Sequence, residues 1–87
     1  MKYIIRTKLT TALNPIVLEI VDESHKHAGH AGAREGGNSH FKLKIVSRTF
    51  TTLSRLERHR FVHEILQDEL NNQIHALSLI LLAPEEL

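Results

Sequence analysis

Residues 54–82 read SRLERHRFVHEILQDELNNQIHALSLILL, and this stretch decides the fold. At its start, Ser54 stands three residues before Glu57, the spacing of a capping box in which each side chain accepts a hydrogen bond from the other residue's backbone N–H. We therefore expect a helix to begin here and to run to about Leu70. Apolar residues at helical spacing predict its buried stripe: Val62, Ile65, Leu66 and Leu70.

One strand is predicted before this helix and another after it. Residues 41–45 alternate apolar side chains with Lys42 and Lys44, so this strand should have one wet face. We expect the asparagines at 71–72 to stop the helix in a left-handed conformation, and residues 74–82 to form a buried strand. Because a strand–helix–strand crossover joins parallel neighbours with right-handed geometry, these two strands should be parallel.

The N-terminal part predicts a helix, a strand and a long loop. Residues 2–13 carry apolar side chains on one helical face: Ile5, Leu9, Ala12 and Leu13. Asn14-Pro15 should end this helix, since the residue before proline avoids the α region. Residues 16–21 are rich in β-branched side chains and predict a strand. Residues 24–39 hold all four glycines and three of the seven histidines, without apolar periodicity, and predict a loop.

Together these elements predict an α+β fold with the order helix, strand, strand, helix, helix, strand. The first of the two consecutive helices is a short helical turn before the long one. The first two strands can pair antiparallel, because a loop alone connects them. The result is a three-stranded mixed sheet covered by helices on one face.

The composition is that of a small globular domain. The chain has 87 residues, a formal net charge of +1 and no cysteine, which excludes disulfides and cysteine-ligated zinc. No apolar segment has the length of a membrane span, and Lys2, Arg6 and Lys8 interrupt any signal-peptide pattern at the N-terminus. We expect one domain over residues 1–87, located in the cytoplasm, or in the mitochondrial matrix or another organelle if the source is eukaryotic.

Five motifs at these spacings resemble the BolA family. They are Leu13-Asn14-Pro15, Asp22-Glu23-Ser24, Ser39-His40-Phe41, Arg58-His59-Arg60 with Val62, and Ile74-His75-Ala76-Leu77-Ser78. The resemblance implies a fold like the type II KH domain. It also implies a non-enzymatic adaptor in iron–sulfur cluster handling or iron sensing. Such an adaptor forms a heterodimer with a monothiol glutaredoxin, either apo or bridged by a [2Fe–2S] cluster and glutathione, and the isolated chain should be a monomer.

The resemblance assigns specific histidines to the shared cluster. His75 matches the family's cluster ligand, and His27 matches the loop position that supplies a second ligand, with His30 as the alternate. Because this chain has no cysteine, the sulfur ligands must come from outside, and we expect no cofactor in the isolated chain. Imidazole in place of thiolate raises the reduction potential of a [2Fe–2S] cluster.

Taken alone, these histidines leave other interpretations open. His75 lies among apolar neighbours and also fits a half-buried structural histidine. The loop sequence His-x-His-x-x-His at His25, His27 and His30 also fits a solvated loop, or a site for zinc or copper.

The alternative function is a DNA-binding transcriptional regulator. The candidate phosphate contacts are Lys42, Lys44, Arg55, Arg58 and Arg60. KH domains clamp nucleic acid with a G-x-x-G turn between two helices, but the turn before the long helix has Thr51-Thr52 where relatives often have glycine. The string Gly-x-x-Gly at residues 29–32 lies between two strands instead. With a net charge of +1, such binding should be weak and salt-sensitive.

The other polar residues of the long helix have structural interpretations. We expect His59 to be satisfied by backbone carbonyls and His63 to lie at the surface. The acidic residues expected on the solvated face are Glu64, Asp68 and Glu69. Ser54 is a cap and not a nucleophile, because no base stands near it at triad-like spacing, so no enzyme is predicted.

Overall fold

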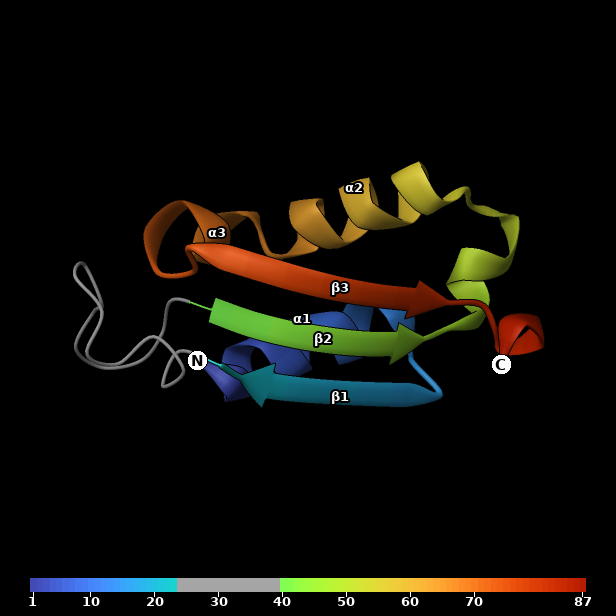
Figure 1. Cartoon of the computed structure of the whole chain (residues 1–87), viewed down its shortest axis with the longest axis horizontal. Coiled ribbons are helices and arrows are strands. Elements are labelled where there is room, and N and C mark those ends of the chain that lie inside the picture. The colour runs from blue at the N-terminus through green and yellow to red at the C-terminus, as the bar shows by residue number, and fades with distance from the viewer. Residues whose placement is uncertain (24–39) are drawn as a thin grey trace.

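Three strands form one mixed sheet in the part of the chain that the computed structural model describes, residues 1–23 and 40–87 (Figure 1). The strands are β1 (Val17–Asp22), β2 (His40–Val46) and β3 (Ala76–Leu82). β2 lies in the middle, antiparallel to β1 and parallel to β3. The predicted pairing and sheet composition are therefore confirmed. The loop 24–39, with His27 and His30, lies outside the described residues.

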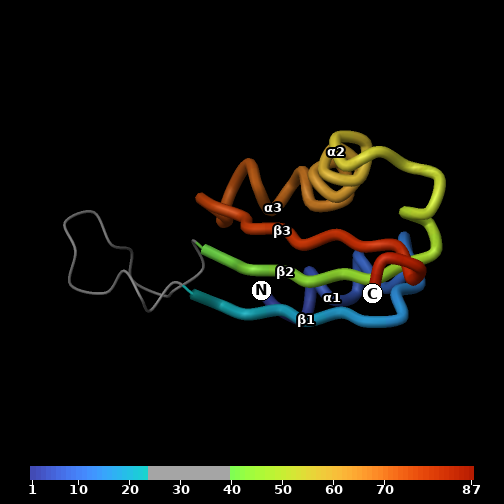
Figure 2. Tube along the Cα trace, turned by 45° about the vertical axis from the view of Figure 1, so that its right-hand side comes forward, coloured from blue at the N-terminus to red at the C-terminus, as the bar shows by residue number. Residues whose placement is uncertain are grey.

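The helices cover one face of this sheet and leave the other open (Figures 1 and 2). They are α1 (Lys2–Leu13), α2 (Arg55–Ile65) and α3 (Gln67–Asn72), with the short 3-10 turns η2 (Arg48–Thr52) and η3 (Pro84–Glu86). Alternate residues of β2 face the helices, and Phe41, Leu43 and Ile45 are fully buried there against apolar side chains of α1 and α2. The predicted α+β class is confirmed.

The long C-terminal helix is divided, which the sequence pattern did not predict. α2 ends at Ile65, and α3 follows after Leu66, whose backbone departs from helical angles at φ −101° and ψ 18°. The side chain of Leu66 is fully buried, so the break lies at a core contact. The predicted left-handed stop at Asn71-Asn72 is wrong, because both residues belong to α3.

The left-handed helix end lies instead at Asn14, directly before Pro15. Asn14 has φ 44° and ψ 58°, and its N–H bonds to the carbonyl of Thr10 at 3.0 Å. Asparagine tolerates this region better than most residues, and Pro15 cannot donate a further helical bond. The predicted end of α1 is confirmed. Ala12, however, is exposed, and the buried face of α1 is Ile5, Leu9 and Leu13.

The capping box at the start of α2 has the geometry that the spacing predicted. The Glu57 N–H donates to Ser54 Oγ at 3.1 Å, and the Ser54 N–H donates to Glu57 Oε1 at 2.8 Å. The backbone hydrogen bond from Ser54 holds the pKa of Glu57 below its ordinary value. Two backbone donors that helix formation would leave unpaired are thereby satisfied.

We expect Ser54→Ala to lower the free energy of unfolding by about 1 kcal/mol, the usual loss when a serine N-cap is removed. Urea unfolding followed by circular dichroism measures this. The matched control is T52A, which removes a hydroxyl from an exposed neighbour outside the cap. Equal stability of S54A and the control would show that the box contributes nothing.

Candidate metal-ligand site

His75 lies in the short bend between α3 and β3. Backbone hydrogen bonds and core packing hold the two residues before it in place. The N–H groups of Gln73 and Ile74 both donate to the carbonyl of Glu69, each at 2.8 Å. Ile74 is buried in the core, and β3 begins at Ala76. β3 therefore starts two residues later than predicted, and His75 precedes it.

The side chain of His75 is exposed. This differs from the half-buried position that its apolar neighbours suggested. Among the residues that the structure describes, none forms a hydrogen bond or an ion pair with its imidazole. A free and accessible imidazole nitrogen is what a metal ligand from this chain would require.

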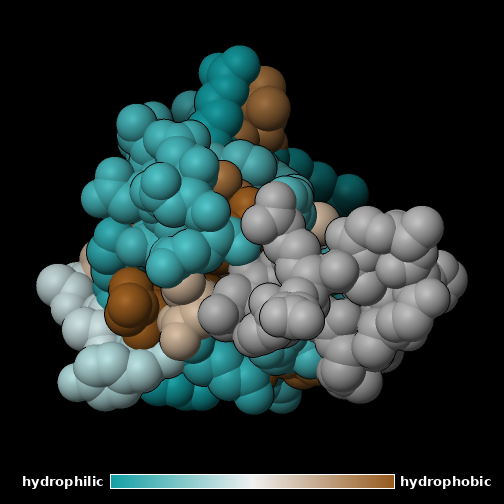
Figure 3. All heavy atoms as spheres, turned by 90° about the vertical axis from the view of Figure 1, so that its left-hand side faces the viewer, coloured by the Kyte–Doolittle hydropathy of each residue, from teal (hydrophilic) through white to brown (hydrophobic). Residues whose placement is uncertain are grey.

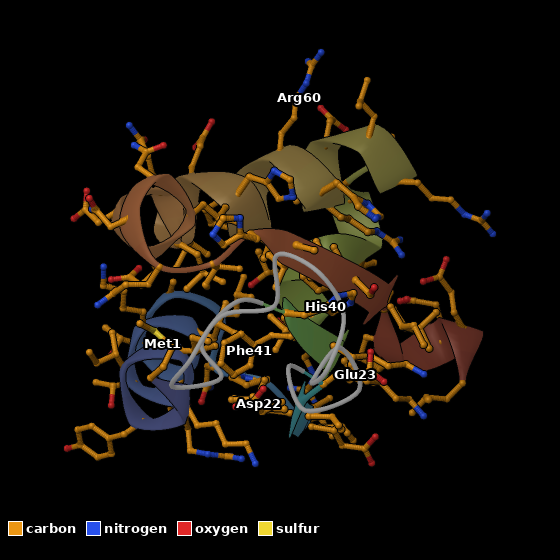
Figure 4. All side chains as sticks on the ribbon, turned by 60° about the vertical axis from the view of Figure 1, so that its left-hand side comes forward. Met1, Asp22, Glu23, His40, Phe41 and Arg60 are labelled. Carbon is orange, nitrogen blue, oxygen red and sulfur yellow. The ribbon has the colours of Figure 1, made fainter. Side chains whose placement is uncertain are left out.

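The two residues that flank segment 24–39, Glu23 and His40, lie at the same end of the sheet as His75. The Glu23 N–H donates to the His40 carbonyl at 2.9 Å, which closes the end of the β1–β2 pair. In the register of β2 with β3, His40 lies opposite Ala76, the neighbour of His75. Figure 4 shows Glu23, just after the end of β1, near His40 at the start of β2, and His40 Nε2 lies 3.6 Å from Glu23 Oε1. The topology thus brings both ends of the histidine-rich segment to the same end of the sheet as His75, with His40 on the strand beside β3.

The described residues do not complete a metal site by themselves. No group of three or more His, Cys, Asp or Glu side chains that could hold a metal is found among them. Hydrophilic side chains cover much of this end of the molecule, seen in Figure 3. A metal bound at His75 would need its other ligands from outside the described residues.

The basic residues predicted to meet phosphates are distributed over two surfaces. Lys42 is exposed and Lys44 is half-buried on the open face of the sheet, beside a shallow hollow of about 250 Å³ that Val21 and Ile80 also line. Arg55 and Arg60 are exposed on α2, and Arg60 points away from the body of the domain (Figure 4).

Arg58 does not belong to the basic surface and corrects the prediction. It is only 6% exposed, and its guanidinium lies 5.8 Å from the ring centre of Phe50. Its Nε donates to the Leu53 carbonyl at 3.0 Å, and its Nη1 donates to the Leu81 carbonyl at 3.1 Å and to Glu86 Oε1 at 2.6 Å. A buried charge must be paired in this way, so Arg58 joins α2, β3 and η3 and is not available to phosphates.

The acidic residues include another departure from prediction. Glu69 is 7% exposed, not solvated, and Lys8 Nζ lies 2.9 Å from each of its carboxylate oxygens. The two residues are 61 positions apart, so no local spacing could have paired them. The histidine predictions hold: His59 Nδ1 lies 2.9 Å from the Arg55 carbonyl, and His63 is exposed.

No helix within the described ranges is long and apolar enough to cross a membrane.

The BolA-like protein family model matches residues 9–86, which is most of the chain. The chain belongs to the BolA family. It is 45% identical over 86 residues to SufE-like protein 1, chloroplastic/mitochondrial, of Arabidopsis thaliana, covering 94% of this chain and 23% of that protein. It is 41% identical over 83 residues to the DNA-binding transcriptional regulator BolA of Haemophilus influenzae, covering 95% of this chain and 77% of that protein.

The fold matches a solved structure of the same family. The BolA domain of SufE1 from Arabidopsis thaliana superposes with a TM-score of 0.84 at 44% identity, covering 95% of this chain and 91% of that domain. The chain spans less than a quarter of the full-length SufE-like relative. The two relatives carry names from different functional classes, one SufE-like and one a regulator of transcription.

The Arg58–Glu86 pair predicts a pH dependence of stability. The hydrogen bond from Arg58 holds the pKa of Glu86 below its ordinary value. A carboxyl group with a lowered pKa stabilises the fold above the pKa of the unfolded chain and loses that effect as the pH falls through the folded-state pKa. We expect E86Q to lower the melting temperature at neutral pH, with a difference from wild type that shrinks in acid.

Thermal unfolding between neutral pH and the acid limit measures this difference. E64Q, which neutralises an exposed carboxylate on α2, is the control and should leave the pH profile unchanged. A constant difference between E86Q and wild type at all pH values would show that the ionised carboxylate is not what stabilises this contact.

Proposed function

We propose that this chain is a non-enzymatic adaptor in iron–sulfur cluster handling or iron sensing, working as a heterodimer with a monothiol glutaredoxin. The observation that carries the proposal is the position of His75, which is exposed and has no side-chain partner among the described residues, at the end of the sheet where the histidine-rich segment begins and ends. Membership of the BolA family and the SufE-like name of one relative support it. The expected location is the cytoplasm, or an organelle matrix in a eukaryote.

In this proposal the chain supplies nitrogen ligands and its partner supplies sulfur. His75 is the ligand from the folded edge, and His27, with His30 as alternate, is the ligand from segment 24–39. Glutathione and the glutaredoxin provide the thiolates that a cysteine-free chain lacks. A [2Fe–2S] cluster held in part by imidazole has a higher reduction potential than one held by thiolates alone.

The division of roles follows from how each histidine is attached. His75 follows Ile74, whose side chain is in the core and whose N–H is bonded to Glu69, so the backbone that carries the imidazole is fixed before any ligand binds. The backbone part of the ordering entropy is then not lost on binding. Segment 24–39 offers three histidines, so one of them can replace another. An apo heterodimer does not depend on either ligand.

A DNA-binding regulator is the second candidate, favoured by the name of the Haemophilus influenzae relative. With Arg58 committed to Leu81 and Glu86, the predicted phosphate contacts that are exposed are Lys42, Arg55 and Arg60, with Lys44 half-buried. They lie on two surfaces, and the net charge is only +1. This arrangement supports few simultaneous phosphate contacts.

We expect His75→Ala to abolish the visible spectrum specific to the cluster-bridged heterodimer, or to return it to that of the glutaredoxin alone, because His75 is the one ligand that this proposal takes from the folded part of the chain. H27A should weaken cluster binding and leave some bound. The triple variant of His25, His27 and His30 should remove the remainder. Absorption and circular dichroism after reconstitution with iron, sulfide, glutathione and the glutaredoxin measure the result.

The control is H63A, which removes an exposed imidazole from α2 and should keep the wild-type spectrum. A wild-type spectrum and cluster lifetime in H75A would return His75 to a structural role and contradict the ligand assignment. Acid should release the cluster in the wild type, since imidazole binds metal in its neutral form.

For nucleic acid, we expect binding that fades between low and physiological salt and shows no sequence preference, because few phosphates can be neutralised. Fluorescence anisotropy with labelled duplexes of different sequence measures it, and K42A with R60A tests the exposed cations. Tight and sequence-selective binding at about 150 mM salt, unchanged by scrambled competitor, would make the regulator the better proposal.

A further inference from the structure

One partly buried ion pair connects the N-terminal helix to α3, which precedes the bend with His75. Lys8 on α1 places its Nζ 2.9 Å from both carboxylate oxygens of Glu69 on α3, and 3.9 Å from Asp68. The Glu69 side chain is 9% exposed and that of Lys8 is 34% exposed. A pair with this geometry and burial is more strongly coupled than a surface pair, and breaking it leaves a poorly solvated carboxylate.

The backbone of Glu69 holds the bend that precedes His75. Its carbonyl accepts both the Gln73 N–H and the Ile74 N–H, each at 2.8 Å. α3 has only six residues, and a helix of this length is not stable without tertiary contacts. The contacts of Glu69 therefore fix two things at once, the position of α3 through its side chain and the start of the bend through its carbonyl.

We propose that the Lys8–Glu69 ion pair positions His75 for its ligand role. The inference rests on the proposed function and adds Lys8, on the N-terminal helix α1, to the residues that serve it. Lys8 forms an ion pair with the Glu69 side chain, and the Glu69 carbonyl accepts the backbone hydrogen bonds of the bend. The bend in turn sets the direction in which the His75 side chain leaves the backbone. Contacts that orient a metal ligand without touching the metal change metal affinity about 10- to 100-fold when they are removed.

The test compares two lysine variants on the same helix. Lys8→Met removes the ion pair and keeps the length of the side chain. K2M makes the identical change at an exposed position at the start of α1. K8R restores the positive charge and should rescue the effect of K8M. S54A serves as a variant destabilised at the distant start of α2, and shows what lower stability alone does.

The first measurement is amide hydrogen exchange in the isolated chain, without iron or partner. In K8M we expect exchange at Gln73 and Ile74 to accelerate about tenfold relative to amides of β2, since the loss of a partly buried pair exceeds that of a surface pair. K2M, K8R and S54A should keep the wild-type ratio. Unchanged exchange at Gln73 and Ile74 in K8M would overturn the positioning role, whatever the cluster does.

The second measurement is the lifetime of the cluster in the heterodimer, followed by its visible circular dichroism after a chelator is added. We expect K8M to shorten this lifetime about tenfold and K8R to restore it, while K2M and S54A match wild type. An equal loss in S54A would overturn the role by showing that global stability alone sets the lifetime.

The two proposals can fail separately. A wild-type chain that holds no cluster with any monothiol glutaredoxin contradicts the proposed function, and the exchange measurement still decides whether Lys8 fixes the bend. A wild-type lifetime in K8M with accelerated exchange leaves the function standing and overturns the positioning role.

If K8M fails to fold, K8Q, whose amide donates an uncharged hydrogen bond, replaces it in both measurements with the same expected direction.

Discussion

The parallel pairing of β2 with β3 is the constraint on which the rest of the structure depends. Two parallel strands cannot be joined by a tight turn, so the chain must cross over between them, and η2, α2 and α3 form that crossover. The crossover buries one face of the sheet and returns the chain to the edge where β2 starts. Because His40 lies opposite Ala76, this register also sets His75 near His40, the residue that follows segment 24–39.

The buried polar residues hold the helices and strands at defined places. Ser47 donates to the Leu13 carbonyl at 2.7 Å and its N–H bonds to the Leu82 carbonyl at 3.0 Å, so one residue joins the ends of α1 and β3. Arg58 and Glu69 carry buried charges that are paired with Glu86 and Lys8. Among the described residues, no buried side-chain nitrogen or oxygen lacks a hydrogen-bond partner. Each polar group in this small core thus makes a contact between elements.

Features set by local spacing could be predicted from the sequence, whereas these contacts between distant residues could not. The capping box at Ser54, the end of α1 before Pro15 and the parallel strands follow from local spacing and chain connectivity, and all were predicted. Whether Arg58 or Glu69 is buried depends on partners that lie 28 and 61 residues away, so their neighbours in sequence carry no signal of it. The break at Leu66 coincides with a fully buried side chain, in a pattern that is helical on both sides.

The two ends of the sheet are held in different ways, and this difference bears on the candidate site. Where β2 and β3 finish, Ser47, Arg58 and the hydrogen bond from Thr51 to Glu85 at 2.8 Å tie several elements together. Where these strands begin, the carbonyl of Glu69 accepts both backbone hydrogen bonds of the bend before His75, and Ile74 packs in the core. In the proposed function His75 is an accessible ligand, so its orientation must come from the residues that precede it. By the same proposal the Lys8–Glu69 ion pair has more influence on His75 than the contacts at the opposite end, because Glu69 also accepts the backbone hydrogen bonds of the bend.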